Sequence, residues 1–409
     1  MIWSQIFNDF HIIEFIDKYG LFQISAKQLK SYKEPRLITK FDCSNQLPEI
    51  MKDYGIHILP NSRGTYLLGH FNIFHSLPNN QEEVEIKKVS FPYWVQSIKP
   101  SNIQSEAVAI SSAEITTMFK DFFGEDSLIP TVSGRMKSGT FDFKIRNTNI
   151  YVNNSQIEID GSLEGKDQFI LIEGKNILHD DFNVRQLYYP YRRFLQKINK
   201  PIKTLYLQFS NGIYRLLEYR FNDPKRYDSI ELVKECKYCI SPETISMQEV
   251  VNVFNSIKPD LITYGAPFIQ CDSFSKLINI VENLELLETI TEEFIYKNFN
   301  FTSRQANYYY NGVIFLGLAF KFGPNIYLTE LGKKIIELPH KERQLALVKR
   351  ILQHRVLYEA FDYYLKYNSI NQDFIKSRMD YYNVCGPQLY DRRSLSVASW
   401  IKWILSIIG

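Results

Sequence analysis

Apolar and polar positions alternate in short blocks through the middle of the chain, and these blocks predict strands and helices in turn. Residues 157–159 (IEI) and 169–172 (FILI) have the β-branched and aromatic content of strands, and the polar segment 161–167 predicts the turn of a hairpin between them. The surrounding pattern predicts helices over residues 104–123 and 181–198, and strands over residues 139–145 and 201–209. We therefore expect an α/β (α+β) fold with a central mixed sheet flanked by helices.

The last third of the chain has the longer periodicity of helices. Residues 273–287, 292–299 and 301–317 predict three helices, and residues 318–322 and 326–329 predict a two-stranded ribbon. Three helices and a ribbon are the arrangement of a winged helix, whose third helix enters a DNA major groove. The alternative is a winged helix that serves only for packing or protein contacts. The residues of the third helix that suit base reading are Ser303, Arg304, Gln305, Asn307, Tyr308 and Asn311.

Composition is typical of an intracellular chain of two or three domains. At 409 residues the chain exceeds one typical domain, and 45% hydrophobic with 23% charged residues supplies full cores. A net charge of +3 argues against a histone-like coating of nucleic acid but allows a local basic surface. Five cysteines form no disulfide framework, and the N-terminus has no signal-peptide pattern. We expect a reduced, cytoplasmic protein that does not enter a membrane.

Three ionisable residues stand at the ends of the two central apolar runs. Asp160 follows the first run, and Glu173 and Lys175 close the second, where strand alternation puts them on one face and Gly174 on the other. Two carboxylates and an ammonium at one strand end are what a Mg²⁺-dependent phosphodiesterase needs, with the Gly174 carbonyl as a further metal ligand. The alternative is an ordinary surface hairpin with solvated charges at its ends.

The spacing of Asp160 followed by Glu173-Gly174-Lys175 resembles the PD-(D/E)xK nuclease superfamily, over residues 104–220. The segment GRMKSGTFDF and the three-part layout are similar to type II restriction endonucleases. The resemblance implies a Mg²⁺-dependent, sequence-specific cut in double-stranded DNA, which leaves 5′-phosphate and 3′-hydroxyl ends. It implies that Asp160 and Glu173 bind the metal and that Lys175 positions the attacking water. It also implies a homodimer, with a DNA methyltransferase as a genetic rather than physical partner.

Further residues around this motif are candidates for supporting roles. Some members of the superfamily carry Gln, with Tyr four residues later, in the second helix, whereas here Gln186 is followed by Pro190 at that place. As an additional acid we choose Glu114, in the first predicted helix, over Glu106, with Asp142 as another candidate. The residues expected to contact DNA near the motif are Arg135, Lys137, Arg185, Gln186, Arg192 and Arg193.

These patterns divide the chain into an N-terminal α+β domain (1–103), a nuclease domain (104–262) and a winged-helix and helical domain (263–409). The first domain is a candidate for DNA recognition. Two other functions fit the same patterns: a structure-selective repair or junction nuclease, and a non-catalytic winged-helix regulator with a degenerate core. The intact Asp, Glu and Lys set argues against the regulator, because a pure DNA binder has no physical reason to retain it.

Overall fold

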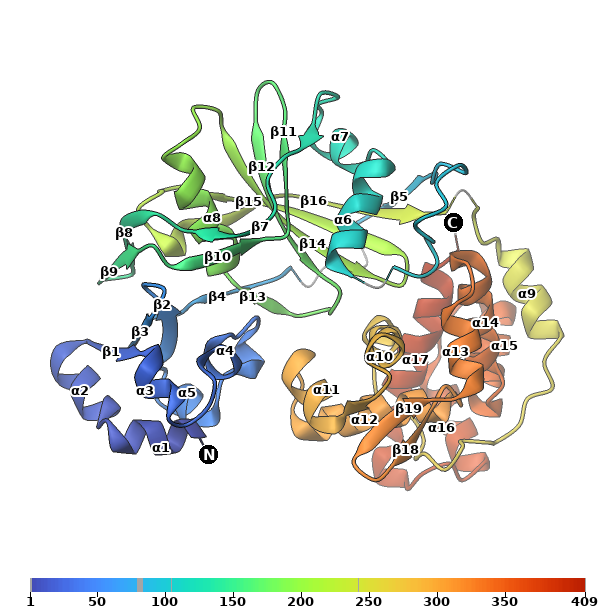
Figure 1. Ribbon diagram of the computed structural model, residues 1–409. Helices are drawn as coiled ribbons and strands as arrows, with labels where there is room; N and C mark the ends of the chain where they lie inside the picture. The colour runs from blue at the N-terminus through green and yellow to red at the C-terminus, as the bar shows by residue number, and fades with distance from the viewer. Residues whose placement is uncertain (1, 79–83, 104, 242, 409) are drawn as a thin grey trace.

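The computed structural model describes residues 2–78, 84–103, 105–241 and 243–408. A large sheet lies above two smaller units, an N-terminal one (blue) and a C-terminal helical one (orange to red), as Figure 1 shows. Met1, Gln104 and Gly409, at which predicted domains begin or end, lie outside the described residues. The architecture is mixed α+β, as the sequence pattern predicts.

The N-terminal unit packs short helices against a small antiparallel sheet of order β1-β3-β2. Ile6 of the first helix is fully buried together with Ile24 and Leu68 of the strands, and these residues belong to a core that continues to the α8 face of the central sheet. Its elements are α1 (Ile2–Asp9), α2 (Ile12–Tyr19), β1 (Leu21–Ser25), α3 (Ala26–Lys30), α4 (Pro35–Thr39), η1 (Ser44–Gln46), α5 (Glu49–Asp53), β2 (His57–Pro60) and β3 (Thr65–Gly69).

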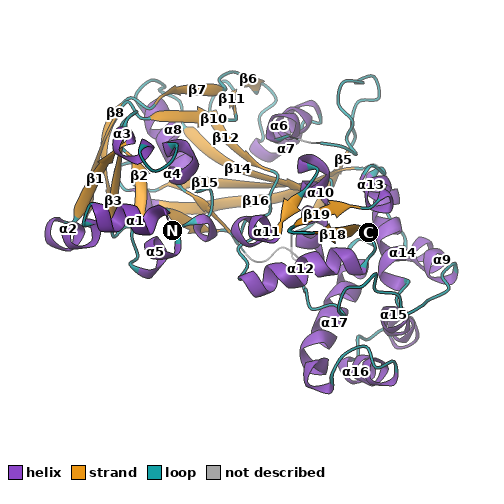
Figure 2. Ribbon diagram, turned by 60° about the horizontal axis from the view of Figure 1, so that its bottom comes forward, coloured by secondary structure: helices purple, strands orange, loops and turns teal. Residues whose placement is uncertain are grey.

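The central sheet has seven strands in the order β5-β16-β15-β14-β12-β11-β6 (Figure 2). β12 pairs in parallel with β14 and antiparallel with β11, so it lies inside the sheet. Every residue of β12 is buried, as expected for a strand covered on both faces. The strands are β5 (Ile86–Val89), β6 (Ile129–Pro130), β11 (Gly161–Glu164), β12 (Phe169–Lys175), β14 (Ile202–Ser210), β15 (Ile213–Phe221) and β16 (Ile230–Ile240).

Helices cover both faces of this sheet. On one face, Ile170 and Ile172 of β12 share a core with α6 and α7. On the other face, Phe169 and Leu171 share a core with α8. Even-numbered residues of β12 therefore face α6 and odd-numbered residues face α8, because side chains alternate along a strand. The three helices are α6 (Glu106–Ile115), α7 (Met118–Phe123) and α8 (Arg185–Leu195).

The hairpin predicted between residues 157–159 and 169–172 is wrong in its pairing. Residues 161–164, predicted as a turn, form β11, and the turn to β12 is restricted to residues 165–168. β10 (Gln156–Ile159) instead pairs with β7 (Gly134–Lys137) in a separate two-stranded sheet. The chain passes from one sheet to the other at Asp160, which a residue-by-residue pattern does not reveal, because both halves look like strand.

Three other predictions need correction. The strand predicted over residues 139–145 forms as β8 (Thr140–Ile145), but it pairs with β9 (Thr148–Asn153) outside the central sheet. The helix predicted from residue 181 begins at Arg185, because β13 (Asp181–Asn183) pairs with β4 (Phe74–Ser76). β5 pairs with β16, so the domain boundary placed at residue 103 does not separate the N-terminal unit from the central sheet.

From α10 onward the C-terminal unit has the order helix, strand, helix, helix, strand, strand, and its small sheet has the order β17-β19-β18. The three helices and the ribbon predicted from the sequence are confirmed, and β17 is an addition. Among the described residues, no helix has both the length and the apolar character needed to cross a bilayer. The elements are α9 (Met247–Asn255), α10 (Phe274–Leu287), β17 (Ile290–Thr291), α11 (Glu292–Asn298), α12 (Ser303–Phe315), β18 (Ala319–Phe322), β19 (Asn325–Leu328), α13 (Glu330–Ile336), α14 (His340–Leu352), α15 (Arg355–Tyr367), α16 (Gln372–Tyr381) and α17 (Tyr390–Ser406).

Candidate active site

The end of β12 brings together the three ionisable residues singled out in the sequence. The alternation of the strand continues to its last residue, so Glu173 and Lys175 follow Phe169 and Leu171 onto the α8 face. Lys175 Nζ donates to Glu173 Oε1 at 2.5 Å and to the Gly174 carbonyl at 3.0 Å. Asp160 Oδ2 accepts the Gly174 N–H at 2.9 Å. The predicted pairing of the hairpin is wrong, yet Asp160 lies beside Glu173 and Lys175. It directly precedes β11, which pairs with β12 and so places Asp160 at the same strand end.

A further acid of this cluster comes from the start of α6. Glu106 Oε1 lies 3.7 Å from Lys175 Nζ, and the Glu106 side chain is 41% exposed. Glu114, the acid chosen from the sequence, lies about two turns farther along the helix, and burial raises its pKa. The choice of Glu114 is therefore wrong in position, since it is the first turn of α6 that meets the strand end. Asp142 lies on the exposed face of β8, in a different sheet.

Gln186 and Asp42 complete the cluster. The Gln186 amide nitrogen donates to Glu173 Oε1 at 2.5 Å and to Asp42 Oδ1 at 3.1 Å. Gln186 was predicted to contact DNA, but it bridges two carboxylates. Asp42 comes from the N-terminal unit, 144 positions away along the chain, and no motif in the sequence marks it. Only its proximity in the fold identifies it.

Burial gives the cluster unusual electrostatics. It raises the pKa of Glu173 to about 8, although the neighbouring Lys175 acts in the opposite direction. Burial alone would lower the pKa of Lys175, but the carboxyl groups of Glu173, Glu106, Asp42 and Asp160 raise it well above its usual value. Lys175 is therefore cationic at neutral pH, and the carboxyl groups around it outnumber it.

The donor set suits a hard divalent cation. Mg²⁺ prefers oxygen ligands and needs only one or two carboxylates besides water and a substrate phosphate. Asp160 and Glu173 provide two carboxylates, and a cation beside them would offset the cost of ionising the buried Glu173. In the parts of the chain that the structure describes, no group of three or more His, Cys, Asp or Glu side chains is arranged to hold a metal ion. A site here would therefore depend on two carboxylates, a carbonyl oxygen and water.

The basic residues predicted to contact DNA differ in accessibility. Arg192 is 7% exposed and donates to the carbonyls of Asp142 and Pro224 and to the Tyr188 hydroxyl. It is committed to these internal contacts, so its prediction as a phosphate contact is wrong. Arg185 and Arg193 are half-buried, Lys137 is exposed, and Arg135 is 53% exposed and pairs with Glu158 at 3.1 Å. For these four residues, DNA contact stays a prediction.

The polar residues of α12 are accessible. Ser303, Arg304 and Gln305 are exposed, and Asn307, Tyr308 and Asn311 are half-buried, whereas Tyr309 and Tyr310 are buried. Arg304 contacts the Tyr308 ring, with its guanidinium carbon 5.5 Å from the ring centroid.

The Gln305 side chain has a structural role at the start of α12. Its Oε1 accepts the Thr302 N–H at 2.9 Å, and the Thr302 hydroxyl accepts the Gln305 N–H, which forms a capping box. A bidentate contact with adenine needs that same oxygen. The predicted adenine contact by Gln305 therefore requires that the cap be broken.

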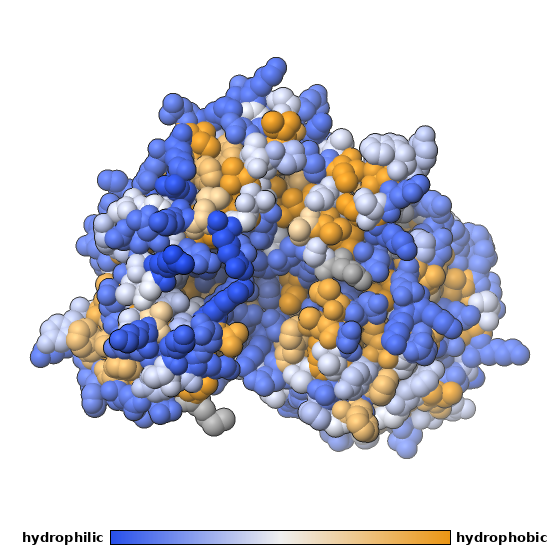
Figure 3. Space-filling model, in the orientation of Figure 1, coloured by the Kyte–Doolittle hydropathy of each residue, from blue (hydrophilic) through white to orange (hydrophobic). Residues whose placement is uncertain are grey.

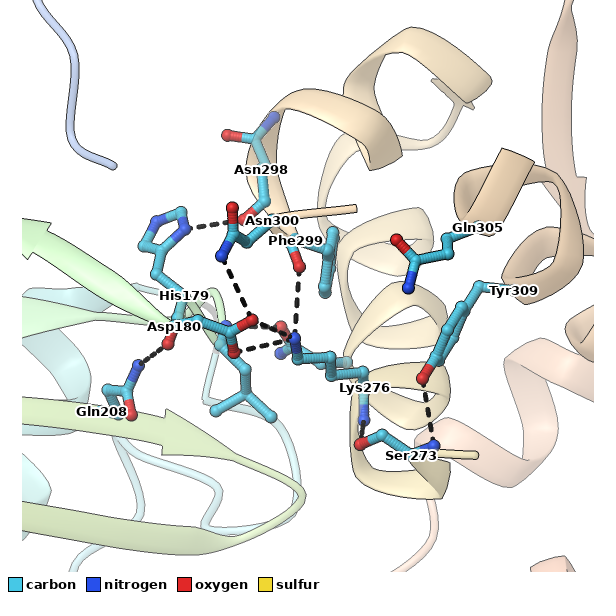
Figure 4. A network of polar contacts seen from close by, with 12 residues as sticks. His179, Asp180, Gln208, Ser273, Lys276, Asn298, Phe299, Asn300, Gln305 and Tyr309 are labelled. Atoms are coloured by element: carbon cyan, nitrogen blue, oxygen red, sulfur yellow. Dashed lines mark hydrogen bonds and ion pairs between the residues drawn. The ribbon is translucent and has the colours of Figure 1, made fainter. Parts of the chain in front are cut away.

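The segment that follows β12 is attached to the C-terminal unit (Figure 4). Lys276 Nζ of α10 donates to the Asp180 carboxylate at 2.8 Å and to the Phe299 carbonyl at 3.2 Å. His179 Nδ1 lies 2.6 Å from the Asn298 carbonyl oxygen. These contacts link the end of β12 to the residues that lead into α12.

The surface around the cluster is polar. Figure 3 shows a hollow between the N-terminal and C-terminal units, beneath the central sheet, with hydrophilic residues on its N-terminal side. Glu106 is 41% exposed, and Lys40, whose Nζ lies 4.0 Å from Asp42 Oδ2, is 52% exposed. Glu173 and Lys175 are buried beside these two accessible side chains.

Three family models match successive parts of the chain. Residues 1–68 match "Domain of unknown function (DUF6996)", residues 69–239 match "Domain of unknown function (DUF6997)" and residues 276–409 match "Domain of unknown function (DUF7226)". No curated protein and no solved structure matches. The second family includes β5, in agreement with the place of that strand in the central sheet.

Proposed function

We propose that this chain is a Mg²⁺-dependent endonuclease of the PD-(D/E)xK superfamily that cuts double-stranded DNA at a specific sequence, most like a type II restriction enzyme. The observation that carries the proposal is the meeting of Asp160, Glu173 and Lys175 at the end of β12. Burial of a lysine with several carboxyl groups costs desolvation free energy, and groups with shifted pKa values of this kind are concentrated at functional sites. Hydrolysis of a phosphodiester to 5′-phosphate and 3′-hydroxyl ends is the function proposed for this site.

The order of the elements supports this classification. α6, the sheet strands β6, β11 and β12, α8 and the parallel strand β14 occur in the order of the superfamily core, which is a helix, three strands, a helix and a further strand, with α7, β7–β10 and β13 inserted between them. The region from α10 to β19 has the helix and strand order of a winged helix, with α12 as its third helix. The first part would cut the DNA and the second would select it.

The residues present would divide the chemistry in the following way. Asp160, Glu173 and the Gly174 carbonyl would hold Mg²⁺, which supplies positive charge to offset the negative charge that develops on the phosphate oxygens. Lys175 would orient the attacking water and stabilise that charge from the protein side. Glu106, at the exposed edge, is the nearest further carboxylate to Lys175.

Cutting both strands of a short site favours a homodimer with two such sites. By the same resemblance, a DNA methyltransferase would protect the host sequence as a genetic partner, and the enzyme would act in the cytoplasm. Asp42 of the N-terminal unit accepts a hydrogen bond from Gln186 in the cluster. The N-terminal unit would therefore be close enough to contact the same DNA.

Digestion of a mixed genomic DNA tests the proposal directly. Full-length protein with Mg²⁺ should produce discrete fragments that share one end sequence and carry 5′-phosphates, as sequencing of the ends would reveal. Cleavage only at branches or nicks would indicate a structure-selective nuclease instead. Binding of DNA with no cleavage in Mg²⁺ or Mn²⁺ would indicate a non-catalytic regulator.

Arg304→Ala on α12 is expected to weaken binding to the cognate DNA by about 1–3 kcal/mol, because Arg304 is the exposed donor best suited to guanine. Binding can be measured in Ca²⁺, which should prevent cleavage. Lys366→Ala on α15, a change of equal charge at a residue 62% exposed, serves as the control. Equal affinities of the Arg304 variant and the wild type would remove α12 from the DNA interface.

A further inference from the structure

Residues 41–46, which we call the strap, connect α4 to α5 and lie where all three units meet. On one side the strap is bonded to β13, directly before α8. Asn183 donates its N–H to the Asp42 carbonyl at 3.0 Å and its side-chain amide to the Phe41 carbonyl at 2.9 Å. Ser44 donates its N–H to Asp181 Oδ1 at 2.8 Å. The strap is therefore held in register with the segment that carries Gln186.

On its other side the strap is bonded to the last residue of α11 and to the segment that connects α11 to α12. Gln46 Nε2 donates to Asn298 Oδ1 at 2.9 Å, and Asn45 Nδ2 donates to the Phe301 carbonyl at 3.1 Å. Asn298 is also the residue whose carbonyl meets His179, as Figure 4 shows. The strap is thus fixed from both the sheet and the C-terminal unit, and Asp42 has little freedom to move.

Asp42 is connected to Glu173 through the side-chain amide of Gln186. The Gln186 amide nitrogen carries two hydrogens, and it has two carboxylate partners, Glu173 and Asp42. Gln186 Oε1 is buried without a hydrogen-bond partner among the described residues, so the hydrogen bonds of this amide are on its nitrogen. The acceptor at Asp42 therefore acts together with Glu173 in turning the nitrogen, and not the oxygen, of this amide toward the cluster.

We propose that Asp42 is a positioning residue for the candidate active site. It is carried there by the N-terminal unit, and through Gln186 it holds the Glu173 carboxylate beside Lys175. This inference rests on the proposed nuclease function, and it gives the N-terminal unit a part in the chemistry in addition to any part in recognition. The role requires a hydrogen-bond acceptor at position 42, and an amide oxygen can supply one as well as a carboxylate.

Two variants separate this role from others. Asp42→Ala removes the acceptor and should lower kcat by about 10–100-fold, the usual cost of losing a partner that orients a metal ligand, with KM for DNA unchanged. Asp42→Asn keeps an acceptor oxygen and should restore kcat to within about threefold of wild type. Asp53→Ala, at an exposed residue of α5, is the matched control. The double variant Asp42→Ala/Gln186→Ala should lose no more than the greater single loss, because the two residues act in series.

The inference is overturned if Asp42→Ala cleaves like wild type, if Asp42→Asn is as slow as Asp42→Ala, or if the losses of the double variant add. If Asp42→Ala lowers the unfolding midpoint, Gln186→Leu takes its place. That change leaves the strap's backbone contacts intact and should give the same loss of kcat.

A calorimetric titration of the full chain with Mg²⁺ in the absence of DNA provides a readout other than cleavage. Asp42→Ala should weaken Mg²⁺ binding by about 10-fold, whereas Asp42→Asn and Asp53→Ala should not. If wild type binds Mg²⁺ but cuts no DNA, the nuclease proposal fails, and the inference about Asp42 is decided by this titration alone. If wild type binds no Mg²⁺, both fail.

Discussion

Lys175→Ala should lower DNA cleavage in Mg²⁺ by at least about a thousandfold, the scale of loss when a preorganised charge is removed from a site of this kind. Lys175 Nζ is held by Glu173 and by the Gly174 carbonyl, so its ammonium is fixed at the strand end before any substrate arrives. No other lysine or arginine bonds to both of these groups among the described residues. Asp160→Ala should cause a loss of similar size, because it removes one of the two carboxylates proposed to hold the metal ion.

The measurement is single-turnover cleavage of a plasmid that contains the site, and DNA binding in Ca²⁺ should be retained by both variants. Lys166→Ala and Asp167→Ala serve as matched controls. They change the same residue types in the turn between β11 and β12, at the opposite end of the strand, where Lys166 is exposed. Full activity of purified Lys175→Ala or Asp160→Ala would end the nuclease assignment.

The second large effect concerns pH and the buried Glu173. Its pKa rises from about 4.5 in the unfolded chain to about 8 in the folded protein. Between these values the folded state holds a proton that the unfolded state has lost, so stability falls as pH rises through this window. The penalty is fully present above about pH 8 and absent below about pH 4. Glu173→Gln cannot ionise, and relative to wild type it should gain roughly 1–3 kcal/mol of stability between pH 5 and pH 8.

Urea unfolding of both proteins at several pH values, without divalent ions, measures this gain. The slope with pH is the readout, because a change in packing caused by the substitution shifts the whole curve of the variant, whereas ionisation of Glu173 changes the slope. Glu164→Gln, on the neighbouring strand β11, should give a curve parallel to wild type. Added Mg²⁺ should stabilise wild type more at pH 8 than at pH 6, since binding requires the ionised carboxylate. Parallel curves for wild type and Glu173→Gln would contradict the burial argument.

Some elements of the fold follow from the sequence pattern, and others depend on tertiary contacts. The helices α10, α11 and α12 of the C-terminal unit and the strands β12 and β14 were predictable, because an apolar helical period or a continuous apolar run marks them in the sequence. The hairpin was not. Residues 161–164 contain Gly, Ser and Glu, which favour a turn, yet β11 forms because β12 and β6 offer it hydrogen bonds on both edges.

At the candidate active site, too, some relations could be predicted from the sequence and others could not. Glu173 and Lys175 share a face of β12 by strand alternation alone, so their proximity could be predicted from their spacing. The choice between Glu106 and Glu114 could not, because both lie on one helix and only the docking of α6 decides which end meets β12. Arg192 was predicted to be on a basic surface, but its helix turns it inward, toward carbonyl groups of distant segments.

The sequence by itself determined strands β12 and β14, helices α10 to α12, the shared face of Glu173 and Lys175, and the polar face of α12, because each depends on neighbours a few residues apart. The tertiary structure alone decided that Asp160 crosses between two sheets and that Glu106 closes one side of the cluster. It also decided that Asp42 arrives from another unit to meet Gln186. These last relations depend on strand pairing and on contacts between segments far apart in the chain, and no periodicity in the sequence encodes them.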